Sequence, residues 1–265
     1  MKDLTISIIG CGNLGLSITQ GLLDSGNISA NQIIATKRNL FPISHLSKLG
    51  VNLYTDNKQA VLESDIVILA VKPYNVQPIL EDLQAELKQK NPILVSVATG
   101  ISINELKIWS QTELAFFRAM PNTATDVKES VTAICHEGAS VNQQQQVKQL
   151  FDQIGQVIYI QENLMDAATV LGACGIAYVM RFIRAMIQGG IEIGFDAKTA
   201  SDIVNQTVKG AAELLITRGE HPEHEIDKVT TPKGCTITGL NEMEHNGFSS
   251  SLIKGIVSSY EKIEK

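Results

Sequence analysis

The chain has 265 residues, of which 44% are hydrophobic and 19% charged, and its formal net charge at pH 7 is −6. This length is enough for two domains with a sizeable core, and the acidic balance argues against nucleic acid as a bulk partner. No apolar stretch approaches the length of a membrane span, and the short apolar run at the N-terminus lacks the form of a signal peptide, so we expect a cytoplasmic protein without a membrane partner.

The first predicted strand ends in a glycine-rich turn. The sequence ISIIGCGNLG places an apolar, β-branched run ahead of Gly10, Gly12 and Gly15, and a helical pattern follows. This spacing is typical of a strand, a tight turn and a helix whose first amides face a pyrophosphate. The alternative is that the glycines serve only the packing of the helix on the strand. As cofactor-binding residues the motif indicates Gly10, Gly12, Asn13 and Leu14.

The second predicted strand, residues 33–36, ends in basic residues. A domain that binds NAD usually carries Asp or Glu about 20 residues beyond the glycines, where the carboxylate holds the ribose 2′-hydroxyl. Here Lys37, Arg38 and Asn39 stand instead, and they suit a 2′-phosphate. We therefore expect NADP, as NADPH, with NAD as a second possible cofactor, and contacts from Thr36, Lys37 and Arg38. The alternative is a basic loop that only faces solvent.

Five further strands are predicted before residue 161, and amphipathic stretches separate them. The predicted helices include residues 76–87 and 141–151, and the strands are residues 66–71, 93–98, 114–118, 131–135 and 157–160. Such an alternation predicts a doubly wound, mostly parallel sheet of the Rossmann type. We assign residues 1–160 to this α/β domain.

Three segments follow predicted strands or turns at the edge where an open α/β sheet binds its ligands. Residues 70–73 end a buried strand with a cation and a helix breaker, so we expect contacts from Ala70, Val71, Lys72 and Pro73. Asn57 either caps a helix or touches the adenosine side of the cofactor. Asn122, in RAMPNTAT, either caps a helix or orients a carboxamide or substrate.

From residue 161 onward the pattern is helical only. Predicted helices cover residues 163–188, 197–217, 235–245 and 249–262, with Gly189 and Gly190 interrupting the first and Asp196 capping the second. We assign residues 161–265 to an all-α domain. Its many small residues and apolar faces favour burial against a second subunit, hence a homodimer. The alternative is packing against its own α/β domain alone.

The turn ahead of the predicted helix at residues 235–245 is a candidate anion site. Free amides at a helix N-terminus together with threonine hydroxyls fit a substrate carboxylate. The alternative is a threonine that only caps the helix. The candidate substrate-binding residues are Thr231, Gly234, Cys235 and Thr236.

The cysteines and histidines predict no metal site. Cys11, Cys135, Cys174 and Cys235 are dispersed without a CxxC or zinc spacing, which is typical of reduced thiols in a cytosolic protein. The five histidines lack converging partners in the sequence.

Over nearly its whole length the sequence resembles the pyrroline-5-carboxylate reductases. The resemblance rests on the ordered set GCGNLG, DIVILAVKP, VSVATGIS, RAMPNTAT, DAATVLGACGIAY and HPEHEIDKVTTPKGCTITGL. That family reduces a small cyclic imine carboxylate to proline with NAD(P)H, and it joins a Rossmann domain to a helical dimerisation domain whose dimers can assemble into rings. By resemblance, Thr169 is the catalytic threonine, which hydrogen-bonds the ring nitrogen or passes it a proton through water, while the 231–236 turn holds the carboxylate.

The chain departs from the family pattern around the expected substrate site. GACGIAY stands at residues 172–178 where SGSGPAY is usual, TPKGCT stands at 231–236 where SPGGTT is usual, and PNTA replaces PNTP. Two of these segments gain a cysteine, Cys174 and Cys235. One hypothesis is that the two thiols lie close together and make the activity sensitive to thiol reagents. The other is that they only replace small side chains.

Two other functions compete with imine reduction. A hydroxyacid dehydrogenase would need a lysine or histidine catalyst in the helical domain, and Lys198 and Lys209 lie beside no convincing substrate motif. A paralogue that binds NADP without making proline would account for the altered segments.

Overall fold

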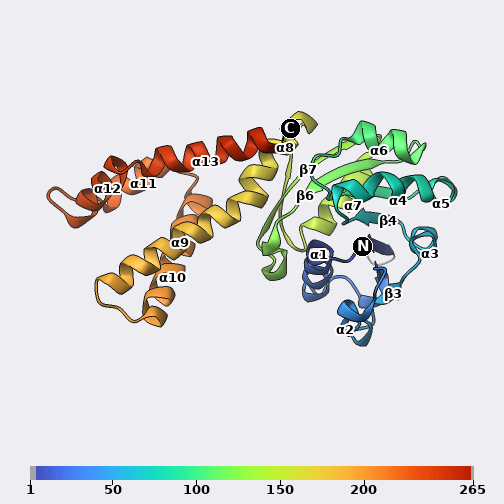
Figure 1. Cartoon of the computed structure of the whole chain (residues 1–265), viewed down its shortest axis with the longest axis horizontal. Helices are drawn as coiled ribbons and strands as arrows, with labels where there is room; N and C mark the ends of the chain where they lie inside the picture. Colours follow the sequence, from blue (N-terminus) through green and yellow to red (C-terminus); the bar gives the residue numbers. More distant parts are fainter. Residues whose placement is uncertain (1–3, 264–265) are drawn as a thin grey trace. The chain divides into compact units, whose positions relative to one another are not determined.

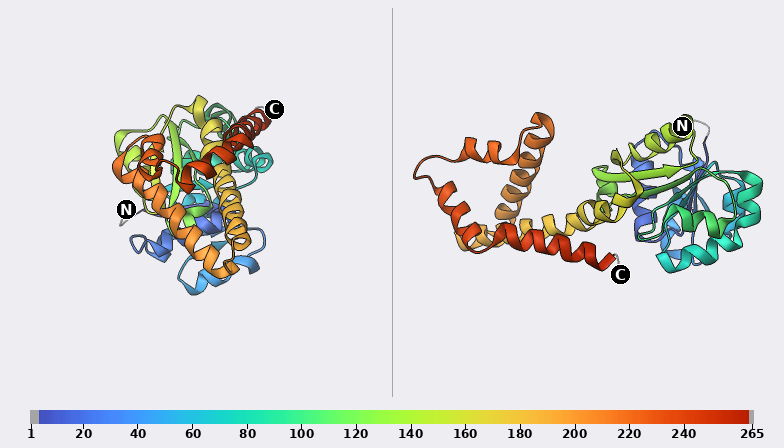
Figure 2. Two further views of the ribbon diagram at one scale, coloured as in Figure 1. Left: turned by 90° about the vertical axis from the view of Figure 1, so that its left-hand side faces the viewer. Right: turned by 90° about the horizontal axis from the view of Figure 1, so that it is seen from above.

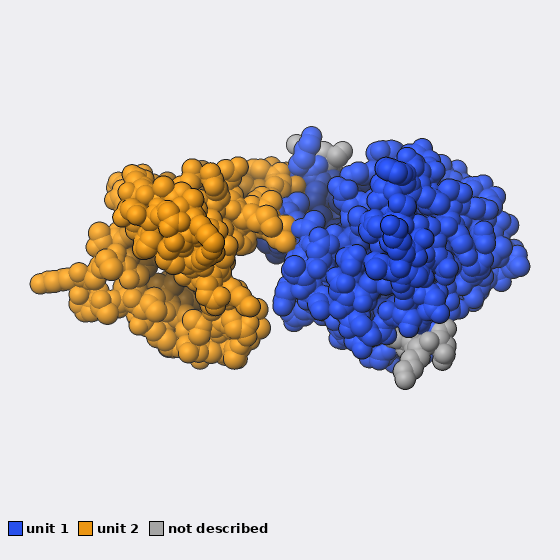
Figure 3. Space-filling model, turned by 90° about the horizontal axis from the view of Figure 1, so that it is seen from below, with its two compact units in different colours: residues 1–174, 262–265 blue, residues 175–261 orange. Residues whose placement is uncertain are grey.

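The computed structural model describes residues 4–263, which form two compact units. Unit 1 contains the chain up to Cys174 together with its last few residues, and unit 2 contains Gly175–Glu261 (Figure 3). Residues 161–174 thus pack with unit 1, although the pattern change in the sequence comes before them.

Unit 1 is built on one sheet with helices packed around it (Figure 1). The sheet has eight strands in the order β3-β2-β1-β4-β5-β6-β7-β8. All neighbouring strands are parallel except β6 and β7. The expected mostly parallel, doubly wound sheet is therefore confirmed, and its strand order reverses between β1 and β4. The strands are β1 Ile6–Ile9, β2 Ile33–Thr36, β3 Asn52–Tyr54, β4 Ile66–Leu69, β5 Ile93–Ser96, β6 Phe116–Met120, β7 Ser130–Glu137 and β8 Gly155–Tyr159.

Helices cover both faces of this sheet, which explains why its central strands are apolar without alternation. Ile8 faces one core, where it packs with residues of α1 and α7, whereas Ile9 faces the other core, which α3 to α6 cover. The helices of unit 1 are α1 Asn13–Asp24, α2 His45–Lys48, α3 Asn57–Leu62, α4 Val76–Asp82, α5 Gln84–Lys90, α6 Ile103–Ser110, α7 Val141–Phe151 and α8 Met165–Ala168.

Most predicted elements of unit 1 are confirmed in kind. The helix at 141–151 is confirmed in both bounds, but the helix predicted at 76–87 is two helices that meet at Leu83. Strand β3 was missed because it has only three residues and carries no apolar run. Strand β4 ends at Leu69, two residues early, because Ala70 and Val71 turn over Gly10.

The helix predicted at 163–188 contains an irregular segment and extends further. After the short 3-10 helix Glu162–Leu164 and α8 comes a π-helical turn, Thr169–Cys174, and then α9 Gly175–Glu192. The predicted interruption at Gly189 and Gly190 is wrong. A Cβ at Gly190 would come within 3.2 Å of the Cβ of Ala200, so this glycine allows close approach of α10 instead of ending the helix.

Unit 2 consists of helices alone, as predicted (Figure 2, yellow to red). They are α9, α10 Ala197–Arg218, α11 Pro222–Val229, α12 Cys235–His245 and α13 Phe248–Ile263. Asp196 caps α10, as predicted, because its carboxylate accepts hydrogen bonds from the amides of Lys198 and Thr199, each at 3.0 Å. Helix α11 was not predicted, because its sequence PEHEIDKV carries few apolar positions.

Unit 2 has almost no core of its own. Within residues 175–261, only Ala200 and Val204 are buried apolar residues, and α9 has no buried residue at all. A single copy of these helices therefore leaves many large apolar side chains exposed to water. Such an exposed apolar surface is typical of a protein–protein interface. They include Val179, Met180, Phe182, Ile191, Ile203, Leu214, Ile216, Leu252, Ile253 and Val257.

One helical segment of residues 4–263, Glu162–Glu192, is long and apolar enough to cross a membrane by length and composition alone. The expectation that no stretch approaches this length is wrong by that measure. The reason is that the helix continues through charged positions such as Arg181 and Arg184, which divide the apolar run in the sequence.

We predict that Gly10→Ala destabilises unit 1 more than Gly26→Ala. Both glycines have positive φ, +86° and +71°, and an L-residue in that region costs about 1–2 kcal/mol. At Gly10 the added Cβ also collides with Val71, whereas at Gly26 nothing lies within 4 Å. Urea unfolding at one protein concentration, followed by Trp109 fluorescence, measures both. Equal shifts of the two midpoints would contradict the packing argument.

Candidate functional site

The glycine turn lies at the point where the strand order reverses, the usual ligand site of such sheets. The amide of Gly10 donates to Oγ1 of Thr36 at 3.2 Å, and the amide of Cys11 donates to the carbonyl of Thr36 at 2.7 Å. A Cβ at Gly15 would lie 3.0 Å from the carbonyl oxygen of Gly10. The turn is therefore held against β2 on one side, and α1 packs closely on it.

The N-terminus of α1 fits a pyrophosphate. Its N-cap is Gly12, in extended conformation, and no side chain accepts a hydrogen bond from the first amides, which include those of Asn13 and Leu14. A Cβ at Gly12 would meet only the Gly10 oxygen, at 3.9 Å, so the space above the turn is open to a ligand. Free amides and an open approach are what an anion needs at a helix N-terminus.

Thr36 and Asn57 form the support of this turn. Thr36 is 1% exposed, and its hydroxyl donates to Oδ1 of Asn57 at 2.7 Å while accepting from Gly10. The hydroxyl is thus engaged inside the protein, so Thr36 acts on a ligand through the position of Gly10. Asn57, half-buried at the start of α3, keeps its Nδ2 group for a ligand; the helix cap is Asp56 instead.

The basic side chains that follow β2 face outward. Lys37 is half-buried and Arg38 is exposed, and neither has an acidic partner among residues 4–263. Lys37 and Arg38 at the end of β2 therefore suit a phosphate on the ribose, because hydrogen bonds between charged donors and charged acceptors are stronger than those between neutral groups.

The residues that follow β4 lie over the same turn. Val71 packs against Gly10, and the amide of Ala70 donates to the carbonyl of Ile9 at 2.9 Å. Lys72 and Pro73 are exposed and begin a 3-10 helix. Unit 1 therefore brings together at one edge the residues predicted after β1, β2 and β4, with Asn57 beside them.

Asn122 follows β6 and is occupied by the protein. It is 8% exposed, its Oδ1 accepts from the amide of Ala124 at 2.9 Å, and its Nδ2 donates to the carbonyl of Gly172 at 3.0 Å. The predicted helix cap is therefore present. The other hydrogen bond, from Nδ2 of Asn122 to Gly172, connects Asn122 to the segment that carries Thr169.

Thr169 opens the π-helical turn and is 4% exposed. Its hydroxyl donates to the carbonyl of Met165 at 2.8 Å, so its oxygen keeps lone pairs available. π-Helical turns are rare and occur often at functional sites.

Sequence reasoning missed the charged residues that hold this segment. Arg118 on β6 is 6% exposed and pairs with Glu162 at 3.1 Å and Asp166 at 3.6 Å. Glu162 also accepts from the amide of Ile103, the first residue of α6, at 2.7 Å. A lone arginine inside an otherwise apolar strand was the available signal, because a buried charge needs a partner.

The candidate carboxylate turn belongs to unit 2, whereas Thr169 belongs to unit 1. The amide of Gly234 donates to the carbonyl of Thr231 at 2.9 Å, and Gly234 caps α12 without a side-chain hydrogen bond, so the amides of Cys235 and Thr236 remain free for an anion. Lys233 has φ +62°, a conformation that glycine adopts more readily. That this turn meets Thr169 around one substrate stays a prediction.

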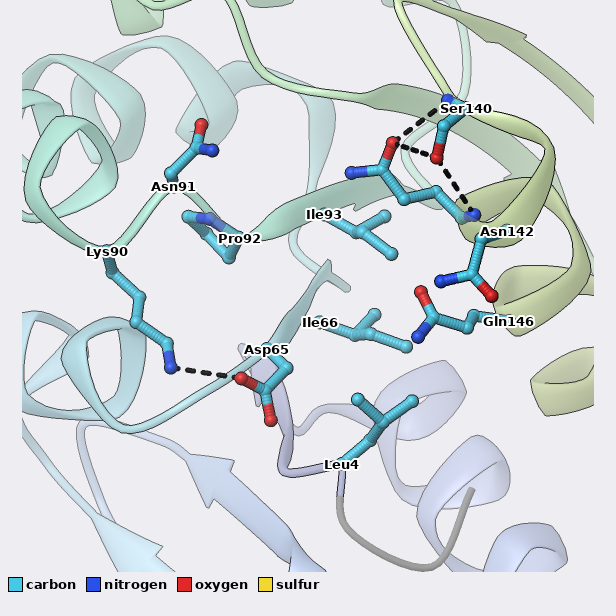
Figure 4. Close-up of a pocket in the computed structure, with 11 residues that line it drawn as sticks. Leu4, Asp65, Ile66, Lys90, Asn91, Pro92, Ile93, Ser140, Asn142 and Gln146 are labelled. Atoms are coloured by element: carbon cyan, nitrogen blue, oxygen red, sulfur yellow. Dashed lines mark hydrogen bonds and ion pairs between the residues drawn. The ribbon is translucent and has the colours of Figure 1, made fainter.

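Two cavities of unit 1 have no residue of the glycine turn in their lining. One, of about 450 Å³, lies at the amino ends of β1, β4 and β5 (Figure 4). Some of its polar groups pair with one another, as in the Lys90–Asp65 ion pair at 3.0 Å and the hydrogen bonds between Ser140 and Gln143. The other, of about 610 Å³, lies beside β7 and β8 and is lined by Cys135 and Glu162 among others.

Two protein-family models match this chain, one in its N-terminal part and one in its C-terminal part. Residues 5–100 match the family model described as NADP oxidoreductase, coenzyme F420-dependent. Residues 162–265 match the model described as pyrroline-5-carboxylate reductase dimerisation.

Full-length relatives identify the family. Pyrroline-5-carboxylate reductase 2 of Dictyostelium discoideum is 42% identical, over 100% of this chain and 93% of that protein. The chain belongs to the pyrroline-5-carboxylate reductase family. The reductase 1 of the same organism is 43% identical over 99% of this chain, which spans only 50% of that protein.

A solved structure of the same family agrees with the fold. The pyrroline carboxylate reductase of Plasmodium falciparum, determined with NADP bound, has a TM-score of 0.91 and 25% identity, covering 99% of this chain and 98% of that one. The resemblance of the sequence to this family is therefore confirmed, as is the order of a Rossmann-type domain followed by a helical dimerisation domain.

The structure also predicts which cysteines react. Cys11 and Cys135 are buried, and burial raises the pKa of both thiols, that of Cys135 to about 11, where the nearby Glu162 charge adds to the effect and Arg118 opposes it. Both thiols therefore stay protonated at pH 8, and thiols react as thiolates.

We expect iodoacetamide at pH 8 to modify exposed Cys235 and half-buried Cys174, while Cys11 and Cys135 react only after unfolding. Peptide mass spectrometry checks this. Cys135 should become reactive in the folded protein only as the pH rises toward 11. Alkylation of native Cys135 at pH 8 would contradict its burial. Unchanged turnover after modification of Cys174 and Cys235 would eliminate the idea that these two make the activity thiol-sensitive.

Proposed function

We propose that this chain reduces 1-pyrroline-5-carboxylate to L-proline with NADPH, the last step of proline biosynthesis. The observation that carries the proposal is helix α1, whose N-terminus no side chain caps, at the sheet's reversal point in a chain of this family. At the end of β2 stand Lys37 and Arg38, which have no acidic partner among residues 4–263. Hydride from NADPH forms a C–H bond at the carbon of the protonated imine, the C=N π electrons become the lone pair of the amine nitrogen, and NADPH is oxidised to NADP+.

The cofactor residues follow from the geometry at the sheet edge. The amides beyond Gly10 and Gly12, at Asn13 and Leu14, hold the pyrophosphate, and Lys37 with Arg38 binds the 2′-phosphate. Thr36 keeps the turn in place. Asn57 and the residues after β4 line the same edge, the latter being Ala70, Val71, Lys72 and Pro73. A bound NADPH supplies the hydride.

The substrate residues follow from the resemblance and from the free groups that they offer. The Thr169 hydroxyl proton is committed to Met165, so the Thr169 oxygen accepts a hydrogen bond from the N–H of a protonated imine. A protonated imine is the better hydride acceptor, and no strong base is required. The turn of Thr231, Gly234, Cys235 and Thr236 holds the carboxylate through free amides.

The proposal also includes the oligomeric state of the protein and its location in the cell. The exposed apolar faces of unit 2 and the dimerisation model support a homodimer, with a ring of dimers as a further step. We propose residues 1–160 and 161–265 as the domains, a cytoplasmic location, and partners that include neither nucleic acid nor a membrane. In a dimer the apolar side chains of Glu162–Glu192 have a protein partner.

A second candidate is a paralogue that binds NADP without making proline. The observation that favours it is Lys233, which occupies a left-handed conformation in the proposed carboxylate turn. Complementation of a proline auxotroph separates the two functions.

We predict that Arg38→Glu raises KM for NADPH about tenfold or more but changes KM for NADH less than about threefold. The reason is that NADH lacks the 2′-phosphate, and tenfold corresponds to about 1.4 kcal/mol of lost binding. Lys48→Glu, at another exposed cation, is the matched control and should affect neither. Equal effects of Arg38→Glu on both cofactors would remove the 2′-phosphate assignment.

We predict that Thr169→Ala lowers kcat with 1-pyrroline-5-carboxylate about a hundredfold, while Thr169→Ser retains most of it because the serine oxygen keeps the lone pairs. Steady-state reduction of this substrate and of its six-membered homologue, with each cofactor, measures both variants. Full turnover by Thr169→Ala would show that the hydroxyl has no part in the reaction.

A further inference from the structure

Asn122 connects the end of β6 to the π-helical turn. Its Nδ2 group donates to the carbonyl of Gly172 at 3.0 Å, three residues beyond Thr169. Its Oδ1 accepts from the amide of Ala124, and its own amide donates to Oγ of Ser130 at 3.0 Å. A nearly buried side chain is thus fixed by two hydrogen bonds, and the backbone by a third.

Arg118, four residues earlier, holds the other side of the same segment. Its guanidinium pairs with Glu162 and Asp166, which precede Thr169 by seven and three residues. Glu162 is itself fixed by the first amide of α6. The segment that carries Thr169 is therefore attached to β6 and its C-terminal loop on both sides of the threonine.

These contacts also determine the position of the π-helical turn that carries Thr169. Thr169 and Val170 are buried at the start of the turn, and a Cβ at Gly172 would come within 3.2 Å of Val131. The turn is thus seated against β7, where a small shift of Gly172 would move Thr169. A misplacement of about 1 Å in a reacting group can cost about a hundredfold in rate.

We propose that Asn122 is a positioning residue, which fixes Thr169 for the reaction by holding the carbonyl of Gly172. The sequence left open a helix cap or the orientation of a carboxamide or substrate by Asn122. The structure shows the cap and, in addition, the contact with the carbonyl of Gly172. This inference rests on the proposed function, because it gives Thr169 its role there.

The two atoms of the Asn122 amide allow a selective test. Asn122→Ser keeps an oxygen that can cap the Ala124 amide, since serine is a favourable N-cap, but its side chain is too short to reach Gly172. Asn122→Ala removes both contacts. The difference between the two variants therefore reports the cap, and the serine variant reports the Gly172 contact. Arg118 is less suitable, because replacing it would remove the ion pairs with both Glu162 and Asp166 at once.

The decisive experiment is a double-mutant cycle with Thr169→Ala in the full chain. We expect Asn122→Ser alone to lower kcat about tenfold, with less than a twofold change in the Kd for NADPH measured by fluorescence. In the Thr169→Ala background the same change should have less than a twofold effect, because Asn122 acts only through Thr169. A tenfold loss in both backgrounds, or a raised NADPH Kd with unchanged kcat, would overturn the proposal.

Hydrogen exchange tests the same inference without turnover. Amides of residues 169–174 should exchange faster in Asn122→Ser than in the unaltered chain, while the amide of Ala124 keeps its protection. Unchanged exchange across the turn would overturn the positioning role. Absence of imine reduction by the unaltered chain would instead contradict the proposed function, and the exchange result would still decide what Asn122 holds.

Discussion

The attachment of the glycine turn to the end of β2 is the constraint on which the cofactor edge depends. One threonine hydroxyl, on Thr36, accepts from Gly10 and donates to Asn57, so three segments far apart in the chain share one hydrogen-bonded point. Val71 closes the turn from the β4 side. Because these groups are buried or half-buried and mutually satisfied, α1 presents its first amides in a fixed direction, and the cations after β2 lie beside the same edge.

A second set of buried polar contacts attaches the segment that carries Thr169 to β6 and the loop after it. Strand β6 carries a buried arginine, and the loop after it carries a buried asparagine; both engage the segment that leads to α9. The Rossmann-type sheet thus supplies the cofactor edge and also the support of the turn that carries Thr169. This explains why residues 161–174 pack with unit 1, while the matched dimerisation model begins at residue 162.

Unit 2 differs from unit 1 because it buries few of its own apolar side chains. It has long helices but almost no buried apolar side chains, so its own packing contributes little of the hydrophobic stabilisation that a domain of this size needs. Its exposed apolar faces are the surfaces that the proposed homodimer would cover, and the proposed carboxylate turn precedes α12. In that turn Lys233, which is in a left-handed conformation, stands where the family pattern has glycine.

The sequence by itself determined the local elements and the cofactor edge, because the residues concerned follow their strands directly. A glycine turn after an apolar run, and Lys37 with Arg38 after the next one, predict their chemistry from spacing alone, and the carboxyl ends of parallel strands meet at one edge. Helix α7 and the cap at Asp196 were equally local. Strand β3 and helix α11 were missed because they carry little apolar signal, and their partners come from elsewhere in the fold.

Only the tertiary structure decided the roles of Thr36, Arg118 and Asn122. Each carries a polar group whose function depends on which distant atom it meets: Gly10, Glu162 and Gly172, respectively. The π-helical turn and the continuation of α9 through Gly189 and Gly190 were also decided by packing, against Val131 and Ala200. Hydrophobic periodicity describes a residue's own element, whereas these outcomes depend on long-range contacts that periodicity does not encode.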